Sequence, residues 1–271
     1  MSDTLTSNEL LFCFDFKVFE GFQGKLFFKK LPLVVPPQGV YMDHIQIAID
    51  GPSGAGKSTI SKAVAKALGI VYVDTGALYR TVGYFAREQG ITVDNAAAVV
   101  PYLDRVSIEV RYENGVQCVY LNGENLGDRI RQNEISMYAS AVSAVPEVRA
   151  FLLDTQKKIA AENSVIMDGR DIGTVILPNA QVKVFMTASN EARARRRCQE
   201  LAEKGMPVSY EEILSDMNRR DEADRTRAVA PAVPAPDAIV FDNSELDFDA
   251  SVAELLRLIQ AVAAEKGIAL S

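Results

Sequence analysis

Short apolar runs alternate with helical patterns along most of the chain. The first run, Ile45–Asp50, leads into a glycine-rich loop and then into Ser58–Leu68. In that second segment Ile60, Val64 and Ala67 recur at the spacing of one helical face. The pattern therefore predicts a buried strand, a loop and an amphipathic helix, which is the start of a βαβ unit.

Four further apolar runs have the length of buried strands: Ile70–Val73, Val165–Met167, Val182–Thr187 and Ala238–Phe241. Helical patterns lie between them, and one closes the chain near Ser251–Lys266. Strands that alternate with helices are typical of parallel sheets covered by helices. The sequence predicts an α/β fold with a parallel five-stranded sheet flanked by helices.

One stretch departs from this rhythm. Between Pro101 and Asn125, apolar and polar residues alternate, and Val116–Leu121 lies between the dipeptides Asn114-Gly115 and Asn122-Gly123. Asn-Gly between β-like runs is the strongest short-range hairpin signal. We expect a small antiparallel insertion inside the α/β domain.

The first 41 residues differ from the rest of the chain. Seven of the twelve phenylalanines fall between Phe12 and Phe28, without a steady period of 2 or 3.6. We expect residues 1–41 to be a non-core extension, disordered or not native, and the natural start to be Met42. A docking or targeting segment is the alternative. The folded domain is then predicted to span residues 42–271.

Charge and cysteine content narrow the class of protein. The net charge of −7 argues against a general nucleic-acid or anionic-membrane binder, which needs a cationic surface. Cys13, Cys118 and Cys198 lie far apart and form no C-x-x-C pair, and the single histidine leaves little for a zinc site. No apolar run reaches the roughly 18 residues of a membrane span. We expect a cytoplasmic protein that binds neither membrane nor nucleic acid.

A phosphate-binding loop follows the first strand. Eight residues fit the pattern G-x-x-x-x-G-K-[ST], and Thr59 directly follows them: Gly51, Pro52, Ser53, Gly54, Ala55, Gly56, Lys57 and Ser58. The glycines let backbone N–H groups turn inward, and the following helix adds positive potential at its N-terminus. Lys57 can reach the β- and γ-phosphates, and the Ser58 hydroxyl can ligate Mg²⁺.

Several classes of P-loop protein compete for this loop. A GTPase is expected to carry N-K-x-D and D-x-x-G motifs; Asp168-Gly169-Arg170-Asp171 is the nearest string and lacks the last glycine. A kinase for a neutral hydroxyl benefits from a general base. A phosphate acceptor is already nucleophilic, because its second pKa is about 6, and it needs positive charge around it. Many arginines and one histidine fit the phosphate acceptor better.

Arginines are placed where such an acceptor would bind. Arg80 follows the second predicted strand and Arg170 the third, at the carboxyl ends where open α/β sheets bind ligands. A guanidinium grips phosphate oxygens in a bidentate manner. A surface salt bridge is the alternative for either one alone, and two arginines at the edge that carries the phosphate loop favour phosphate binding.

Two helices carry further arginines. Ser209 and Glu212 form a capping box, after which Arg220, Asp224 and Arg227 fall on one narrow helical face. Periodicity alone favours a solvated ion-pair ladder there. Another helix, which stops at Gly205, carries four arginines that could close over ATP or could simply keep the surface soluble: Arg193, Arg195, Arg196 and Arg197.

Four strings together resemble bacterial cytidylate kinases, within the nucleoside monophosphate kinase superfamily: Ile49–Thr59, Asp74–Arg80, Asp168–Thr174 and Arg220–Pro231. They span the chain from about Ile45 onward. The resemblance implies a P-loop NTPase-type kinase domain with a nucleoside monophosphate-binding insertion at about 101–136 and a short helical lid at about 190–208. It implies transfer of the γ-phosphoryl group of ATP, with Mg²⁺, to CMP or dCMP by a monomeric enzyme.

The resemblance also implies roles for individual residues. It makes Lys57, Arg80 and Arg170 catalytic, and Ser58 and Asp168 metal ligands. Arg193 and Arg196 join the phosphate loop in binding ATP. The implied contacts of CMP are Arg80, Arg170 and Thr75 for the phosphate, Ser140, Arg149 and Asp171 for the cytosine edge, Arg220 and Asp224 for the ribose, and Arg227 for base or phosphate. The alternatives are a UMP or AMP kinase and a P-loop binding module without turnover.

Overall fold

The computed structural model describes residues 44–113, 115–203, 205–206 and 208–270. The predicted extension, residues 1–41, lies outside the described residues. The described residues form eight strands: β1 (Gln46–Asp50), β2 (Val71–Asp74), β3 (Ile108–Glu113), β4 (Val116–Leu121), β5 (Glu124–Asn125), β6 (Val165–Asp168), β7 (Val182–Thr187) and β8 (Ile239–Asp242). Five of them form one parallel sheet in the order β2-β6-β1-β7-β8, so the predicted fold is confirmed.

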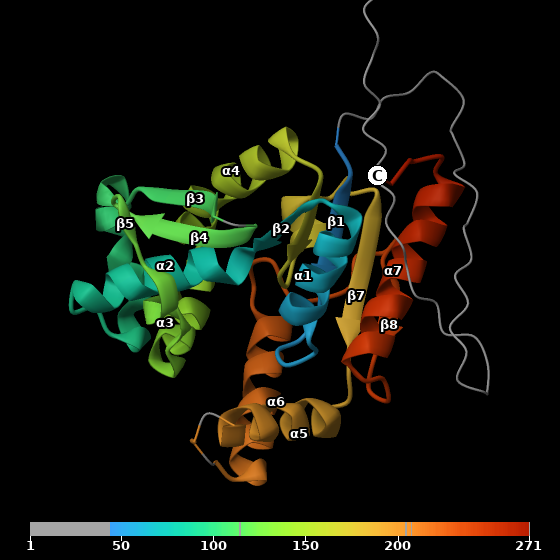
Figure 1. Cartoon of the computed structure of the whole chain (residues 1–271). Coiled ribbons are helices and arrows are strands. Elements are labelled where there is room, and N and C mark those ends of the chain that lie inside the picture. Colours follow the sequence, from blue (N-terminus) through green and yellow to red (C-terminus); the bar gives the residue numbers. More distant parts are fainter. Residues whose placement is uncertain (1–43, 114, 204, 207, 271) are drawn as a thin grey trace, which may run out of the picture. The chain divides into compact units, whose positions relative to one another are not determined.

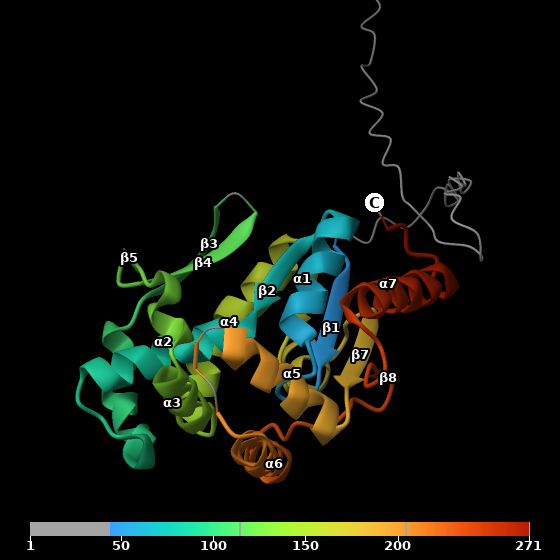
Figure 2. The same ribbon diagram turned by 60° about the horizontal axis from the view of Figure 1, so that its bottom comes forward.

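Within the part of the chain that the structure describes, seven α-helices pack around these strands: α1 (Lys57–Leu68), α2 (Thr75–Glu88), α3 (Asn133–Ser143), α4 (Pro146–Glu162), α5 (Asn190–Glu203), α6 (Tyr210–Thr226) and α7 (Phe248–Glu265). Three shorter helical segments join them: η1 (Val93–Arg105), η2 (Gly127–Arg131) and η3 (Ile172–Ile176). In Figure 1, α1 and α7 cover the sheet on one side, while α5 and α6 lie beyond the carboxyl ends of the strands. Figure 2 gives the same arrangement from below.

Alternation along β1 explains how the sheet is buried on both faces. Ile47 and Ile49 pack with residues of α1, β7 and α7, whereas Ala48 between them packs with residues of β6 and α4. All three side chains are fully buried. A strand that is apolar on both faces is the expected pattern for a parallel sheet covered by helices. This burial holds β1 in the sheet up to Asp50, after which the phosphate loop begins.

The predicted antiparallel insertion is also present, although its strands begin at Ile108 and the predicted start, Pro101, lies in η1. β3, β4 and β5 form a separate three-stranded sheet, in which Glu113 pairs with Val116 across the predicted turn. Its buried residues Val119 and Leu121 join a core made with α2 and α3. Gln117 on β4 connects this small sheet to the main one, because its side-chain amide accepts from the Asp74 N–H at 2.8 Å and donates to the Asp74 carbonyl at 3.2 Å.

Gly51 is required by its surroundings at the end of β1. Its φ is +144°, a region that side chains disfavour, and a β-carbon added there would lie 1.9 Å from the carbonyl oxygen of Met186. Gly51 therefore lets the chain turn out of the sheet against β7. Among the described residues, no helix combines the length and the apolar character needed to cross a membrane.

Candidate active site

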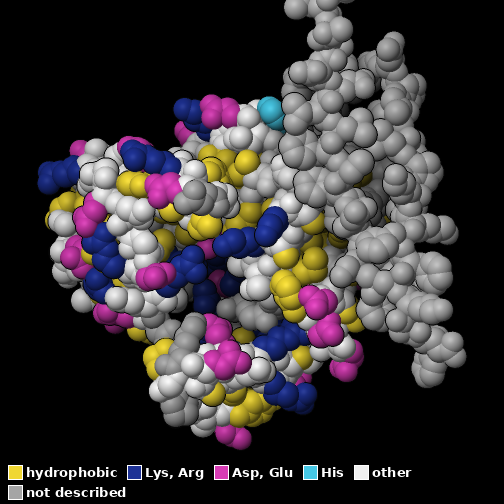
Figure 3. Space-filling model, in the orientation of Figure 1, with side chains coloured by type: hydrophobic (Ala, Val, Ile, Leu, Met, Phe, Trp, Pro, Cys, Tyr) yellow, Lys and Arg dark blue, Asp and Glu magenta, His cyan; other side chains and the backbone are white. Residues whose placement is uncertain are grey.

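A pocket of about 480 Å³ opens at the carboxyl ends of the parallel strands. Figure 3 shows Lys and Arg side chains gathered around a hollow in this face of the molecule. The pocket is lined by residues from the phosphate loop, from the segments after β2 and β6, and from α3, α4, α5 and α6. Of the predicted site residues, only Gly51, Pro52 and Ala55 do not line it.

Lys57 lies at the first position of α1, directly after Gly56 at φ +83°. Its side chain is 6% exposed, and its ammonium group donates to the Pro52 carbonyl at 2.7 Å. Burial, reinforced by the nearby Arg170 charge, lowers the pKa of Lys57 to about 7. This cation is poorly compensated in the structure, so an anion in the phosphate loop would stabilise it.

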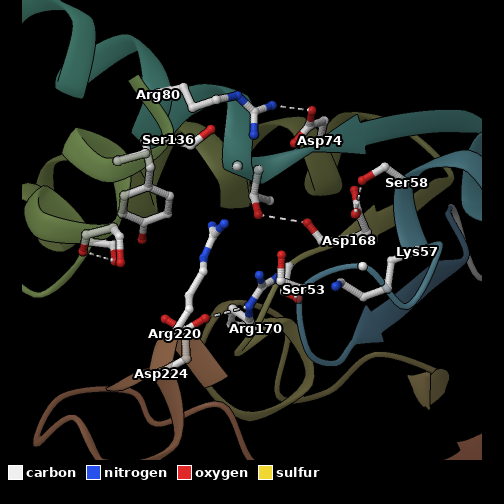
Figure 4. A pocket seen from close by; sticks show the side chains of 18 of the residues that line it. Ser53, Lys57, Ser58, Asp74, Arg80, Ser136, Asp168, Arg170, Arg220 and Asp224 are labelled. Atoms are coloured by element: carbon white, nitrogen blue, oxygen red, sulfur yellow. Dashed lines mark hydrogen bonds and ion pairs between the residues drawn. The ribbon is translucent and has the colours of Figure 1, made fainter. Parts of the chain in front are cut away.

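The carboxylate of Asp168, at the end of β6, accepts hydrogen bonds from two hydroxyl groups. Ser58 Oγ donates to Asp168 Oδ2 at 2.7 Å, and Tyr72 Oη donates to Oδ1 at 2.8 Å. Thr75 Oγ1 donates to the Asp168 carbonyl at 2.7 Å. Burial, with the charge of Asp74 second, raises the pKa of Asp168 to about 6. The predicted pair Ser58 and Asp168 thus meets at one point beside the phosphate loop (Figure 4).

Three arginines converge on the other half of the pocket. Arg80 pairs with Asp74 at 2.6 Å, and Arg170 pairs with Asp224 at 2.8 Å. Arg220 points from α6 into the middle of the site in Figure 4. Burial, then the charges of Arg170 and Arg80 that face it, lower the pKa of Arg220.

In this half of the pocket, the carboxylates of Asp74 and Asp224 leave some of the arginine donors unsatisfied. The Nε atoms of Arg80 and Arg220 are buried, and neither has a hydrogen-bond partner within the described residues. A buried donor left unpaired is costly. Both atoms belong to side chains that line the pocket, which suits an anionic ligand with several oxygen acceptors.

The far end of the pocket holds a buried network of opposite charges. Asp171 is paired with Arg149 through Nη2 and with Arg227 at 3.4 Å. Burial raises the pKa of Asp171, while both arginines oppose the rise. Ser140 and Ser143 line the same end, and Arg227 Nη1 lies 3.5 Å from Ser143 Oγ. Hydrogen-bond donors and acceptors are thus fixed at this end of the pocket.

The two lid arginines that were predicted to bind ATP, Arg193 and Arg196, already bond to other residues of the protein. Arg193 is 2% exposed; it pairs with Asp221 at 2.6 Å and donates to the carbonyls of Ala188 and Ser53. Arg196 donates to the side chain and carbonyl of Asn243, after β8. Both line the pocket, yet in this structure they connect α5 to the phosphate loop and to β8. Contact with ATP stays a prediction for both.

Sequence reasoning missed Asp50, the last residue of β1. Its carboxylate is 4% exposed and accepts from the N–H groups of Ile172 and Gly173, both at 2.7 Å. These amides directly follow Arg170 and Asp171, so Asp50 anchors the loop that carries both. An acidic residue at the end of an apolar strand was the available signal.

Asp50 leads to a prediction for stability against pH. Burial raises its pKa to about 6, with Asp171 adding to the rise and backbone hydrogen bonds and Lys57 opposing it. Because the folded pKa exceeds the unfolded one of 3.8, the contribution is favourable below pH 3.8 and is lost as pH rises through about 6. The difference in unfolding free energy between wild type and Asp50→Asn should therefore fall by up to about 3 kcal/mol from pH 4 to pH 7. Urea unfolding at both pH values measures it, and a constant or rising difference contradicts it.

A parallel sheet, a phosphate loop and a facing cluster of arginines define a P-loop protein that binds phosphorylated ligands. The cytidylate kinase family model matches residues 47–261. The chain is 46% identical to a cytidylate kinase of Caldicellulosiruptor bescii over 221 residues, which cover 82% of this chain and 98% of that protein. A cytidylate kinase of Flavobacterium johnsoniae is 46% identical over 226 residues, with coverage of 82% and 98%.

The chain belongs to the cytidylate kinase family. A shikimate kinase structure from Bacteroides thetaiotaomicron aligns with a TM-score of 0.41 and 14% identity, over 80% of this chain and 98% of its own. Family membership rests on the sequence matches and not on this distant likeness. Family membership confirms the resemblance seen in the four strings, and it favours a cytidylate kinase over a GTPase switch or a kinase for a neutral hydroxyl.

Proposed function

We propose that this protein transfers the γ-phosphoryl group of ATP to CMP and dCMP, giving CDP and dCDP. The observation that carries the proposal is one pocket that contains both Lys57 of the phosphate loop and the arginines Arg80, Arg170 and Arg220. Transfer between two phosphates requires two adjoining anion sites, and the cationic side chains of this pocket supply both. The family of the chain supports cytidine as the nucleoside.

On the donor side, the phosphate loop receives the ATP phosphates and Lys57 neutralises charge at the β- and γ-phosphates. The Ser58 hydroxyl and the Asp168 carboxylate, already 2.7 Å apart, are oxygen donors of the type that Mg²⁺ prefers, and they fit a site shared with substrate phosphates. A bound Mg²⁺ would offset negative charge on the transferred group. Ser58 and Asp168 would hold it, directly or through water.

On the acceptor side, Arg80 and Arg170 orient the CMP phosphate toward the γ-phosphorus. No general base is needed, since a phosphate dianion is already a nucleophile. The partners of these arginines, Asp74 and Asp224, hold the guanidinium groups in place before substrate arrives. The catalytic contribution is therefore positioning and charge neutralisation, which is what phosphoryl transfer demands.

The network around Asp171 accounts for base selection. A carboxylate can accept from the exocyclic amino group of cytosine, whereas uracil presents a carbonyl there. A buried carboxylate opposite a carbonyl leaves an unpaired acceptor, which discriminates more strongly than a missing methylene. Arg149 and Arg227 are paired with Asp171, and Ser140 lines the same pocket; these three are proposed to meet the other edge atoms. Arg220 and Asp224 are proposed to contact the ribose.

A coupled assay of ADP release, run with CMP, dCMP, UMP and AMP at equal concentrations, tests the proposal. The expected result is turnover with CMP and dCMP well above that with UMP or AMP. A preference for UMP or AMP would assign another monophosphate kinase. ATP binding without turnover on any acceptor would reduce the protein to a binding module.

A further inference from the structure

Helix α6 lies directly against the phosphate loop. Gly54, near the tip of the loop, is so close to Met217 of α6 that an added β-carbon would come within 2.4 Å of the Met217 methyl carbon. Met217 is buried in a small core that α5 and α6 share. Movement of the loop at Gly54 therefore changes the packing of the Met217 side chain against it.

A polar bridge joins the same two elements. Arg193 Nη1 donates to the Ser53 carbonyl at 2.7 Å and lies 2.6 Å from Asp221 Oδ2, while the Ser53 N–H donates to Asp221 Oδ1 at 3.4 Å. Arg193 is itself held by the Ala188 carbonyl, just after β7. Both backbone groups of Ser53 are thus tied to α6 through Asp221 and its arginine partner.

The same helix contacts the acceptor half of the site. Asp224, about one turn after Asp221, pairs with Arg170 on the loop after β6, as the dashed line in Figure 4 shows. Arg220, next to Asp221 in sequence, points into the pocket. One turn of α6 therefore holds the phosphate loop with Asp221 and the acceptor residues with Arg220 and Asp224.

We propose that Asp221 is a positioning residue that couples the ATP and CMP sites through α6. Asp221 is not among the residues that line the pocket, so its effect passes through Ser53, Arg193 and the helix. Phosphates bound in the loop hold Ser53 in place. Because Asp221 is bonded to Ser53 and to its partner Arg193, the position of α6 is then held as well. Arg220 and Asp224 on the same helix are thereby kept in place for the acceptor. The proposal rests on the proposed function. Coupling of this kind is reciprocal: ATP tightens CMP binding by the factor by which CMP tightens ATP binding.

The experiment is calorimetric titration of CMP into the full-length protein, with and without a saturating non-hydrolysable ATP analogue and Mg²⁺. We expect the analogue to tighten CMP binding at least about fivefold in the wild type. In Asp221→Asn the analogue should change CMP binding by no more than about twofold, because the Asn amide has a single oxygen to accept from both Ser53 and Arg193. CMP binding without the analogue should stay within about threefold of wild type, since Asp221 does not reach the pocket.

Glu222→Gln is the matched control. Glu222 is the next residue on α6 and pairs with Arg225 on the exposed side of the helix, so the same chemical change there should leave the coupling factor intact. Thermal melting of each variant checks folding. If Asp221→Asn does not fold, Asp221→Ser, which also removes the ion pair, replaces it with the same expected loss of coupling.

The outcomes separate this inference from the proposed function. A wild-type protein that binds no CMP contradicts the proposed function. A wild type that binds and phosphorylates CMP, but shows no coupling or retains full coupling in the Asp221 variant, leaves the function standing and overturns the role of Asp221. A lower melting temperature with unchanged coupling also overturns it, because that is the signature of a purely structural ion pair.

Discussion

Lys57→Met is expected to lower kcat at least a thousandfold, which corresponds to about 4 kcal/mol of lost transition-state stabilisation. Methionine keeps most of the apolar length of the side chain and removes only the ammonium group. In the structure Lys57 is 6% exposed, and its ammonium group donates to the Pro52 carbonyl of the phosphate loop. Electrostatic stabilisation in a site shielded from water is worth far more than in solution.

The measurement is steady-state ADP release with CMP, with kcat and both KM values determined separately. The loss should appear mainly in kcat, because the charge that Lys57 neutralises grows as the phosphoryl group is transferred. Lys62→Met is the control: Lys62 is an exposed residue of the same helix α1, and its removal should leave kcat within about twofold. A Lys57 variant with kcat within tenfold of wild type would exclude the proposed role.

The sequence was informative where the signal is local. The phosphate loop is a continuous string between a strand and a helix, and α1 begins at Lys57 as that string requires. The predicted strand Val182–Thr187 coincides with β7; β1 and β6 differ from prediction by one residue at one end, and β2 and β8 are each shifted by one residue toward the C-terminus. Buried parallel strands are short apolar runs, so their limits are visible without knowledge of the fold.

Pairings between distant residues were not predictable in the same way. Asp50 binds amides more than a hundred positions away, and Arg193 pairs with Asp221 on the next helix. The local sequence pattern around these residues does not indicate which distant residue each of them contacts. Spacing predicted one helical face for Arg220, Asp224 and Arg227, and periodicity alone favoured a solvated ladder; in the structure α6 ends at Thr226, directly before Arg227. The structure instead directs Arg220 and Asp224 into the pocket, because α6 packs against the phosphate loop.

The same limit explains the lid arginines. A cluster of four arginines on one helix indicates positive charge near ATP, but it does not tell which guanidinium groups are already bonded. Arg193 makes bonds to Ala188, Ser53 and Asp221 that only the folded chain brings together. A residue predicted to contact ATP is therefore, in this structure, part of the framework that holds the phosphate loop.

Arg170→Ala is expected to lower kcat/KM for CMP more than a hundredfold, or about 3 kcal/mol and more. Arg170 follows β6, and its guanidinium lies in the pocket with Nε paired to Asp224 at 2.8 Å. Removing it deletes one of the cations that orient the acceptor phosphate and also leaves Asp224 without its shortest ion pair. Both losses act on CMP, so KM for CMP should rise and kcat should fall, while KM for ATP should change by less than about threefold.

Arg170→Lys distinguishes charge from shape. Lysine keeps the positive charge but cannot hold Asp224 and a phosphate oxygen with separate N–H groups, as the planar guanidinium can. We expect kcat/KM of Arg170→Lys to be about tenfold above that of Arg170→Ala and no higher, since bidentate geometry is what positions the attacking oxygen. Arg225→Ala, on the exposed side of α6, serves as the control and should keep wild-type kinetics. An Arg170→Ala enzyme within threefold of wild type would remove this residue from the reaction, and with it the argument that two adjoining cationic sites carry the transfer.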